Sequence, residues 1–357
     1  MKVFSDRRGK RHPGLTGAVL AFALLALADP VVPAWSQQSQ QTPAGVATLP
    51  PALRAAFLAG NAQQIAAVIS TLSNGSPTQA ASLSAALLSV AESTLATDPT
   101  RAIQAAAAAV QTVRATPVVT SAPQQTEMVL TQASRIFVAP GVQRAAPELS
   151  ASVATAAIAV AATTGNPVLV ANVSVSAMKV AEAVLAVSPA AAVQIASQAT
   201  QAVGVSAAVQ QSAPQQVMDV AISAARIIVN PDAQRVAPQA VGTIAGTVAT
   251  VVTNPAVYQS APAAAIRVMA DSYATVKSPQ VTAADPSLSV SVVRAITDAS
   301  KDTRLSQINA SNGAETNAIL AGTAVAQQPI TQTNTQTPQV TNPTNDGLIV
   351  VNNASPS

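Results

Sequence analysis

The feature that most constrains this chain is a long internal duplication. The sequence Ser-Ala-Pro-Gln-Gln occurs at residues 121–125 and again at residues 212–216. When these copies are aligned, Arg135 falls on Arg226 and Pro140 on Pro231, and after a three-residue deletion Asn166 meets Asn254. A chain that repeats itself on this scale folds into stacked units, because each unit buries its apolar face against its neighbours.

A shorter period lies inside the duplication. Copies of the dipeptide Ala-Pro that start at residues 122 and 146, and at residues 213, 237 and 261, follow one another in steps of 24. Upstream, Pro77 and Pro99 are 22 residues apart. The elementary unit therefore has 22–24 residues, which is the length of one helix and its turn.

Eight dipeptides of Ser, Asp or Asn followed by Pro mark expected helix starts, because the polar side chain caps the helix and Pro fits its first position. They are Ser76-Pro77, Asp98-Pro99, Asn166-Pro167, Ser188-Pro189, Asn230-Pro231, Asn254-Pro255, Ser278-Pro279 and Asp285-Pro286. Apolar residues between these marks follow helical spacing, as at Ile103, Ala106, Val110 and Val113. We predict an all-α protein in which nine to eleven tandem antiparallel helices over residues 51–303 form an α-solenoid or an elongated bundle.

The first 36 residues have the layout of a signal peptide, with a basic head, an apolar run and a Pro-containing stretch of small residues. We expect cleavage after Ser36, with Ala28 as the alternative. Arg7-Arg8 leaves twin-arginine export open, and an uncleaved membrane anchor is a further alternative. We therefore expect an exported protein in the periplasm, at the cell surface or outside a bacterial cell.

Three other segments differ in composition from the repeats. Residues 37–50 are rich in Gln, Pro and Ser and are expected to be a linker, and residues 304–330 are expected to form one more weak helix. Residues 331–357 are rich in Thr, Gln, Asn and Pro, which is typical of a disordered tail.

The composition excludes most catalytic chemistry. The chain has no cysteine and one histidine, His12, which lies in the expected signal peptide, so the common nucleophile–base pairs and zinc sites with nitrogen or sulfur ligands cannot be built. The carboxylates are scattered, and no phosphate-binding glycine motif occurs. We expect no catalytic, cofactor-binding or metal-binding residues, and no enzyme.

Two further groups of residues, a pair of glycines and the aromatic residues, are expected to act in packing. Gly242 and Gly246 form a GxxxG motif within a stretch that also contains Pro238, Gln239 and several threonines, which favours close packing in a water-soluble helix over a membrane dimer. The few aromatic residues of the mature chain are expected to be core residues: Phe57, Phe137, Tyr258 and Tyr273.

Basic residues that recur between the copies are the candidate partner-binding site. They are Arg135, Arg144, Lys179, Arg226, Arg235 and Arg267. One hypothesis is that they brace helix ends or nearby acids, and the other is that they form a basic ladder that binds an acidic ligand. The structural role is favoured, since the 13 basic and 13 acidic residues after residue 36 leave no net charge.

We therefore expect an exported, non-catalytic scaffold that binds a protein partner or associates with itself, without nucleic acid, small molecule or stable membrane span. The alternative is an envelope protein that binds lipid or a hydrophobic ligand through amphipathic Ala- and Val-rich helices. A third hypothesis, a protein that binds ice or matrix through Ala, Thr and Ser faces, requires more regular threonine spacing than the chain has.

Overall fold

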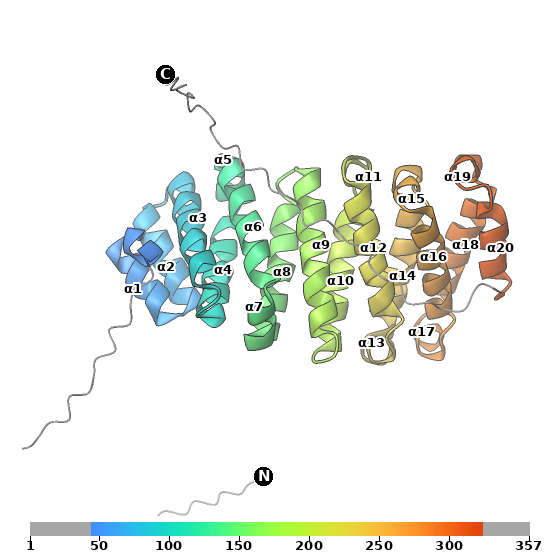
Figure 1. Cartoon of the computed structure of the whole chain (residues 1–357), viewed down its shortest axis with the longest axis horizontal. Coiled ribbons are helices and arrows are strands. Elements are labelled where there is room, and N and C mark those ends of the chain that lie inside the picture. Colours follow the sequence, from blue (N-terminus) through green and yellow to red (C-terminus); the bar gives the residue numbers. More distant parts are fainter. Residues whose placement is uncertain (1–43, 324–357) are drawn as a thin grey trace, which may run out of the picture. The chain divides into compact units, whose positions relative to one another are not determined.

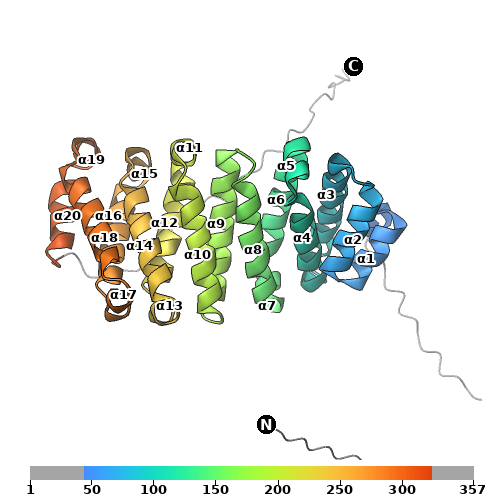
Figure 2. The same ribbon diagram turned by 180° about the vertical axis from the view of Figure 1, so that it is seen from behind.

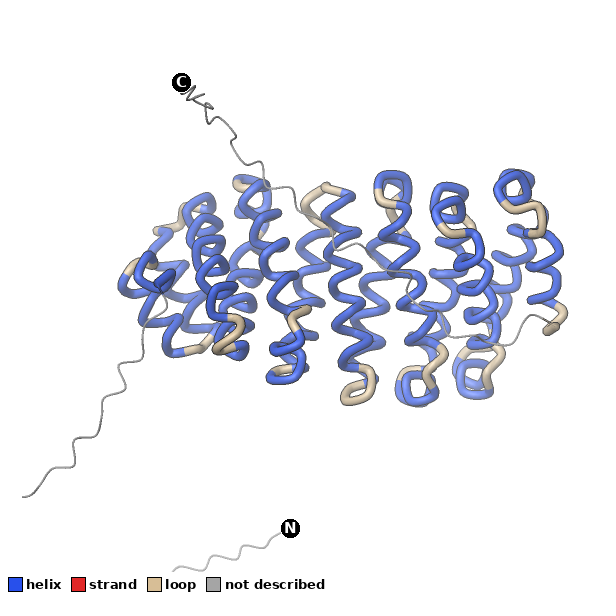
Figure 3. The backbone as a smooth tube through the Cα atoms, viewed as in Figure 1, coloured by secondary structure: helices blue, strands red, loops and turns tan. Residues whose placement is uncertain are grey.

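The computed structural model describes residues 44–323, and these residues form only helices and turns. They comprise 20 α-helices and one short 3-10 helix, η1 (Ala44–Thr48). The helices stand side by side in a row from α1 (Pro51–Ala59) to α20 (Asn312–Leu320) (Figure 1). No strand occurs in this part of the chain (Figure 3). The predicted all-α repeat fold is confirmed.

The longer helices form two layers, and each helix packs against its neighbours within its own layer and across to the other. Layer A consists of α3 (Pro77–Thr94), α6 (Pro123–Phe137), α9 (Pro167–Val184), α12 (Pro214–Ile228), α16 (Pro262–Val276) and α20. Layer B consists of α2 (Ala62–Ser73), α4 (Pro99–Val113), α8 (Pro147–Ala161), α10 (Pro189–Gly204), α14 (Pro238–Val252) and α18 (Ser287–Lys301). Views from opposite sides show the same succession (Figures 1 and 2).

Six-residue helices line the two edges of the row. One edge carries α5 (Thr116–Ser121), α11 (Ala207–Ser212), α15 (Pro255–Ser260) and α19 (Thr303–Ile308) (Figure 1). The other edge carries α7 (Pro140–Ala145), α13 (Pro231–Val236) and α17 (Pro279–Ala284). Six of these short helices pack against a long helix in the preceding repeat, as α11 does against α9 and α13 against α10, whereas α19 contacts α15 and α20.

Proline decides whether a repeat holds one helix or two. In four repeats a second Pro stands seven residues after the first, and in three of them, as at Pro255 and Pro262, it ends the short helix and starts a 15-residue helix. Ser84 and Ser174 stand at that position in α3 and α9, and each of these helices runs without a break for 18 residues. We expected nine to eleven helices over residues 51–303, and the structure has 18 there, α1 to α18, because the recurring Ala-Pro pairs are themselves helix starts.

The expected caps explain where most repeats begin. Seven of the eight polar-Pro dipeptides place Pro at the first position of a helix, whereas at Asp285-Pro286 helix α18 begins at Ser287. In five cases the capping side chain accepts a hydrogen bond from the first turn, and these residues are Ser76, Asp98, Asn166, Asn230 and Asn254. The caps set the register of each helix against its neighbours.

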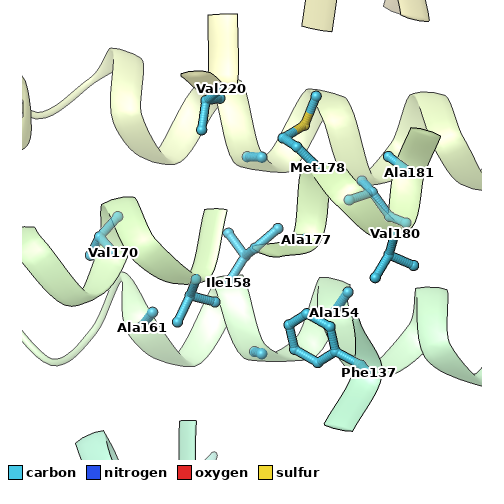
Figure 4. Packing of buried hydrophobic residues seen from close by; sticks show 14 of the residues in the cluster. Phe137, Ala154, Ile158, Ala161, Val170, Ala177, Met178, Val180, Ala181 and Val220 are labelled. Carbon is cyan, nitrogen blue, oxygen red and sulfur yellow. The ribbon is translucent and has the colours of Figure 1, made fainter. Parts of the chain in front are cut away.

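The core is a continuous seam of small apolar side chains between the layers. Around α9 it contains Phe137, Ile158, Met178 and Val220, all at most 3% exposed (Figure 4). Alanine fills most of the remaining positions and lets the helices approach closely. Each alanine buries little apolar area, so the fold depends on repetition of many similar contacts.

Glycine and aromatic residues pack as expected. A side chain at Gly242 would meet Leu288 and would lie 2.8 Å from Val281, so this glycine permits close contact of α14 with α17 and α18. Phe57, Phe137 and Tyr258 are fully buried, and Tyr273 is half-buried.

The ends of the row differ in detail from the expected boundaries. The expected linker extended to Pro50, but residues 44–48 form η1, and Val46 and Leu49 are buried because their apolar side chains complete the first core layer. Where one weak helix was expected, the structure has α19 and α20. The expected signal peptide, residues 37–43 and the tail lie outside the described residues.

Candidate functional site: repeated ion pairs of layer A

The structure places the six repeated basic residues on two surfaces. Arg135, Lys179, Arg226 and Arg267 lie on consecutive helices of layer A, namely α6, α9, α12 and α16. Arg144 and Arg235 lie on the short helices α7 and α13 at one edge. A single ladder of all six residues is therefore not formed.

Arg226 and Glu182 join two neighbouring helices of layer A. The distance from Arg226 Nη1 to Glu182 Oε1 is 3.3 Å, and each side chain is 28% exposed. Arg226 stands in the last turn of α12, where a positive charge also interacts favourably with the helix dipole. The pair thus links α12 to α9 at a partly buried position.

An equivalent ion pair occurs about 90 residues earlier in the chain. Arg135 Nη1 lies 3.8 Å from Glu92 Oε1, and these residues join α6 to α3. Arg135 is 48% exposed, so this ion pair is longer and more accessible to solvent than the pair of Arg226 and Glu182. Burial raises the pKa of Glu92, and the nearby Arg135 partly opposes that rise.

A third acid of layer A, Asp271, lies on α16 and is not the counterpart of Glu182. When Lys179 is aligned with Arg267, Glu182 falls on Ala270 and Asp271 falls on Ala183. Burial raises the pKa of Asp271, and Arg267, one turn away on the same helix, opposes that rise. The repeated ion pair therefore occurs twice in the described residues, at Arg135 with Glu92 and at Arg226 with Glu182.

Lys179 faces an acid as well. It is exposed on α9, and its charge opposes the rise in pKa that burial causes at Asp219 on α12. Gln215 also donates a hydrogen bond to Asp219 over 3.4 Å. We call the three acids whose pKa is raised by burial the desolvated carboxyl groups: Glu92, Asp219 and Asp271.

The two edge arginines make local contacts. Arg144 Nε donates a hydrogen bond over 3.2 Å to the carbonyl oxygen of Pro140, within its own helix. Arg235 forms an ion pair with Asp232 on the same short helix. Both resemble the turn-bracing contacts expected from the structural hypothesis more than a surface that awaits an acidic ligand.

Layer B is almost without charge over its middle. Helices α10 and α14, which are neighbours, contain no charged residue, and α8 contains only Glu148 in its first turn. Exposed positions on these helices carry uncharged side chains such as Gln194, Gln201, Thr243 and Thr250. The outward face of layer A therefore carries paired charges, whereas the middle of layer B, from α8 to α14, carries small or amide side chains.

The sequence pattern did not lead us to the acidic partners of Arg135 and Arg226. Glu92 and Glu182 are 90 residues apart, each within Val-Ala-Glu, but the comparison began at Ser121 and did not extend upstream to Glu92. Extending the repeat to Ser76 would have aligned Ser76 with Asn166 and Glu92 with Glu182. The repeated acid and the repeated arginine would then have predicted a repeated ion pair.

Residues 44–323 were searched for a metal-binding cluster and for helices that could span a membrane. Within this part of the chain, no group of three His, Cys, Asp or Glu residues is close enough to hold a metal ion. Helix α9 alone among the described helices is long and apolar enough to cross a membrane by length and composition, and 56% of it is buried in the array, as in a core helix.

Fold and site together define an α-solenoid whose repeated charged residues interact largely with one another. No family model, curated protein or solved structure matches this chain. Its function is therefore argued from its own residues.

Proposed function

We propose that this protein is an exported, non-catalytic scaffold of the bacterial cell envelope or the extracellular space. Its helical array holds a protein partner or further copies of itself. The observation that carries this proposal is the contrast between the layers, because layer A has ion pairs between its helices and the middle of layer B offers an uncharged surface over α10 and α14. Such a surface suits contact with protein better than contact with nucleic acid or anionic lipid, which require unpaired basic residues.

Export and lack of catalysis rest on the sequence. The signal-like N-terminal segment supports export. The absence of cysteine and the single histidine, His12, support a non-catalytic role, since the common nucleophile–base pairs need those side chains.

The scaffold is favoured over the lipid-binding alternative because the apolar faces of the described helices are turned into the core. A helix that binds a membrane surface instead exposes an apolar face flanked by basic residues. Exposed large apolar residues are scattered over several elements, as are Leu58, Val205 and Val290.

Chemical cross-linking and recovery of the tagged protein from fractionated bacterial cells tests the proposal. We expect one dominant envelope protein, or the protein itself in large assemblies. Gln194→Arg and Thr243→Arg place charge on layer B, and Asn172→Arg and Ala183→Arg place the same charge on layer A as a matched control. Recovery that none of these variants changes, or binding of the protein to liposomes in flotation without any protein partner, would overturn the scaffold.

A further inference from the structure

Two Asn-Gly pairs lie in the described chain, and the structure places them in opposite environments. They are Asn74-Gly75, between α2 and α3, and Asn312-Gly313, at the start of α20. An asparagine side chain followed by glycine is prone to attack by the next backbone nitrogen, because glycine has no Cβ to hinder ring closure. Whether the reaction occurs depends on exposure and on freedom of the local backbone.

Asn74 has both. It ends α2 in the left-handed conformation, with φ 46° and ψ 41°, and its side chain is exposed. Its side-chain amide makes no hydrogen bond with other described residues. Gly75 has φ +76°, and a side chain there would meet nothing within 4 Å. The backbone at Gly75 therefore has open space beside it, with no packed side chain against it.

Asn312 is held in place. It is fully buried, and its Nδ2 donates a hydrogen bond over 2.7 Å to the carbonyl oxygen of Ala299. Its Oδ1 accepts a hydrogen bond over 3.0 Å from the Tyr258 hydroxyl, which is also buried. Gly313 is confined as well, since a side chain there would lie 3.3 Å from the carbonyl oxygen of Ser300. Reaction at Asn312 requires local unfolding of α20.

We propose that Asn74 is a site of spontaneous deamidation in the folded protein and that Asn312 is not. The backbone nitrogen of Gly75 forms a bond to Asn74 Cγ, the Cγ–Nδ2 bond breaks, and ammonia leaves with the proton of the Gly75 N–H. Water then opens the cyclic imide at either carbonyl, which yields aspartate or isoaspartate. The product adds a negative charge between α2 and α3, where Arg54 is the one charged residue of residues 44–91.

The test follows both sites in the same intact chain. The full-length protein is incubated folded, at mildly alkaline pH, and trypsin then releases a fragment that contains Asn74, bounded by Arg54 and Arg101, and a second fragment that begins after Arg304 and contains Asn312. Tandem mass spectrometry locates the mass increase that accompanies replacement of an amide by a carboxyl group. We expect conversion at Asn74 at least about tenfold faster than at Asn312, because two buried hydrogen bonds protect the latter.

A parallel incubation in urea provides the control. Both pairs should then react at similar rates, since unfolding removes the difference in environment. Equal rates in the folded protein would overturn the proposal, and so would conversion of Asn74 in urea without conversion in the folded protein. Asn74→Gln, which lengthens the side chain and disfavours the five-membered ring, should abolish the change at this position and keep the helical circular dichroism spectrum.

Discussion

The pair of Arg226 and Glu182 should contribute measurably to stability, and the equivalent pair of Arg135 and Glu92 should contribute less. The perturbation is a double-mutant cycle at each pair, with glutamate and arginine replaced by glutamine singly and together. The cycle is needed because Arg226 has a further interaction besides the ion pair, so its single replacement removes more than this contact.

The structure sets the expected magnitude. At 3.3 Å the direct attraction between Arg226 and Glu182 is about 1 kcal/mol in water and about 5 kcal/mol at an effective dielectric constant of 20. Desolvation of two partly buried groups offsets most of the larger value. We expect a coupling free energy of about 1 kcal/mol for this pair, at the upper end of the range for surface ion pairs.

The first pair should be weaker for two structural reasons. The atoms are 3.8 Å apart, and Arg135 is 48% exposed. We therefore expect a coupling of at most about 0.5 kcal/mol between Arg135 and Glu92. Added salt should reduce this coupling more than that of Arg226 and Glu182, since exposed charges are screened more effectively.

The assay is urea unfolding followed by far-ultraviolet circular dichroism, together with amide hydrogen exchange of α9 and α12. Exchange is included because stacked repeats do not always unfold in one step. Equal couplings at the two pairs, or a stronger coupling at Arg135 than at Arg226, would refute the link between burial and strength that this reasoning uses.

Two further predictions test the packing and the charges of the array. Gly242→Ala should destabilise the protein by about 1–2 kcal/mol, because overpacking against Leu288 outweighs the gain in helix propensity. Gly246→Ala should stabilise it by up to about 1 kcal/mol, since the nearest neighbour of the added side chain is the exposed Ser291 hydroxyl at 3.3 Å. Thermal and urea unfolding of both variants would check this prediction, and equal effects would contradict it. The desolvated carboxyl groups have a pKa above their ordinary values of 4.5 for Glu and 3.8 for Asp, so they bind protons more tightly in the folded state, and the free energy of unfolding should rise as pH falls from neutral toward about 4.5. Asp271→Asn should flatten that pH dependence in a series of melting curves, and an unchanged slope would count against burial as its cause.

The overall fold could be predicted largely because proline and capping residues punctuate this chain. Asn166 and Asn254 each cap a helix, and Pro follows at the position where its missing N–H costs nothing. The number of helices could not be predicted by counting polar caps alone. Ala122 and Ala213 cap helices without a side-chain hydrogen bond, so only the proline after each marks the start. Proline alone is the more reliable signal in such repeats.

The repeat in the sequence does not by itself predict where the charged residues lie on the array. The repeat aligns Arg135 with Arg226, but it does not say which surface either residue occupies. That depends on the fold, which places Arg144 on the edge helix α7 and Arg135 on the layer A helix α6 although the two residues are only nine positions apart in sequence. Nor does periodicity by itself say which helices touch: Glu92 and Arg135 form a pair because α3 packs against α6, and Glu182 and Arg226 form a pair because α9 packs against α12. The ion pairs of this array thus depend on the packing of neighbouring helices in layer A as well as on the repeat in the sequence.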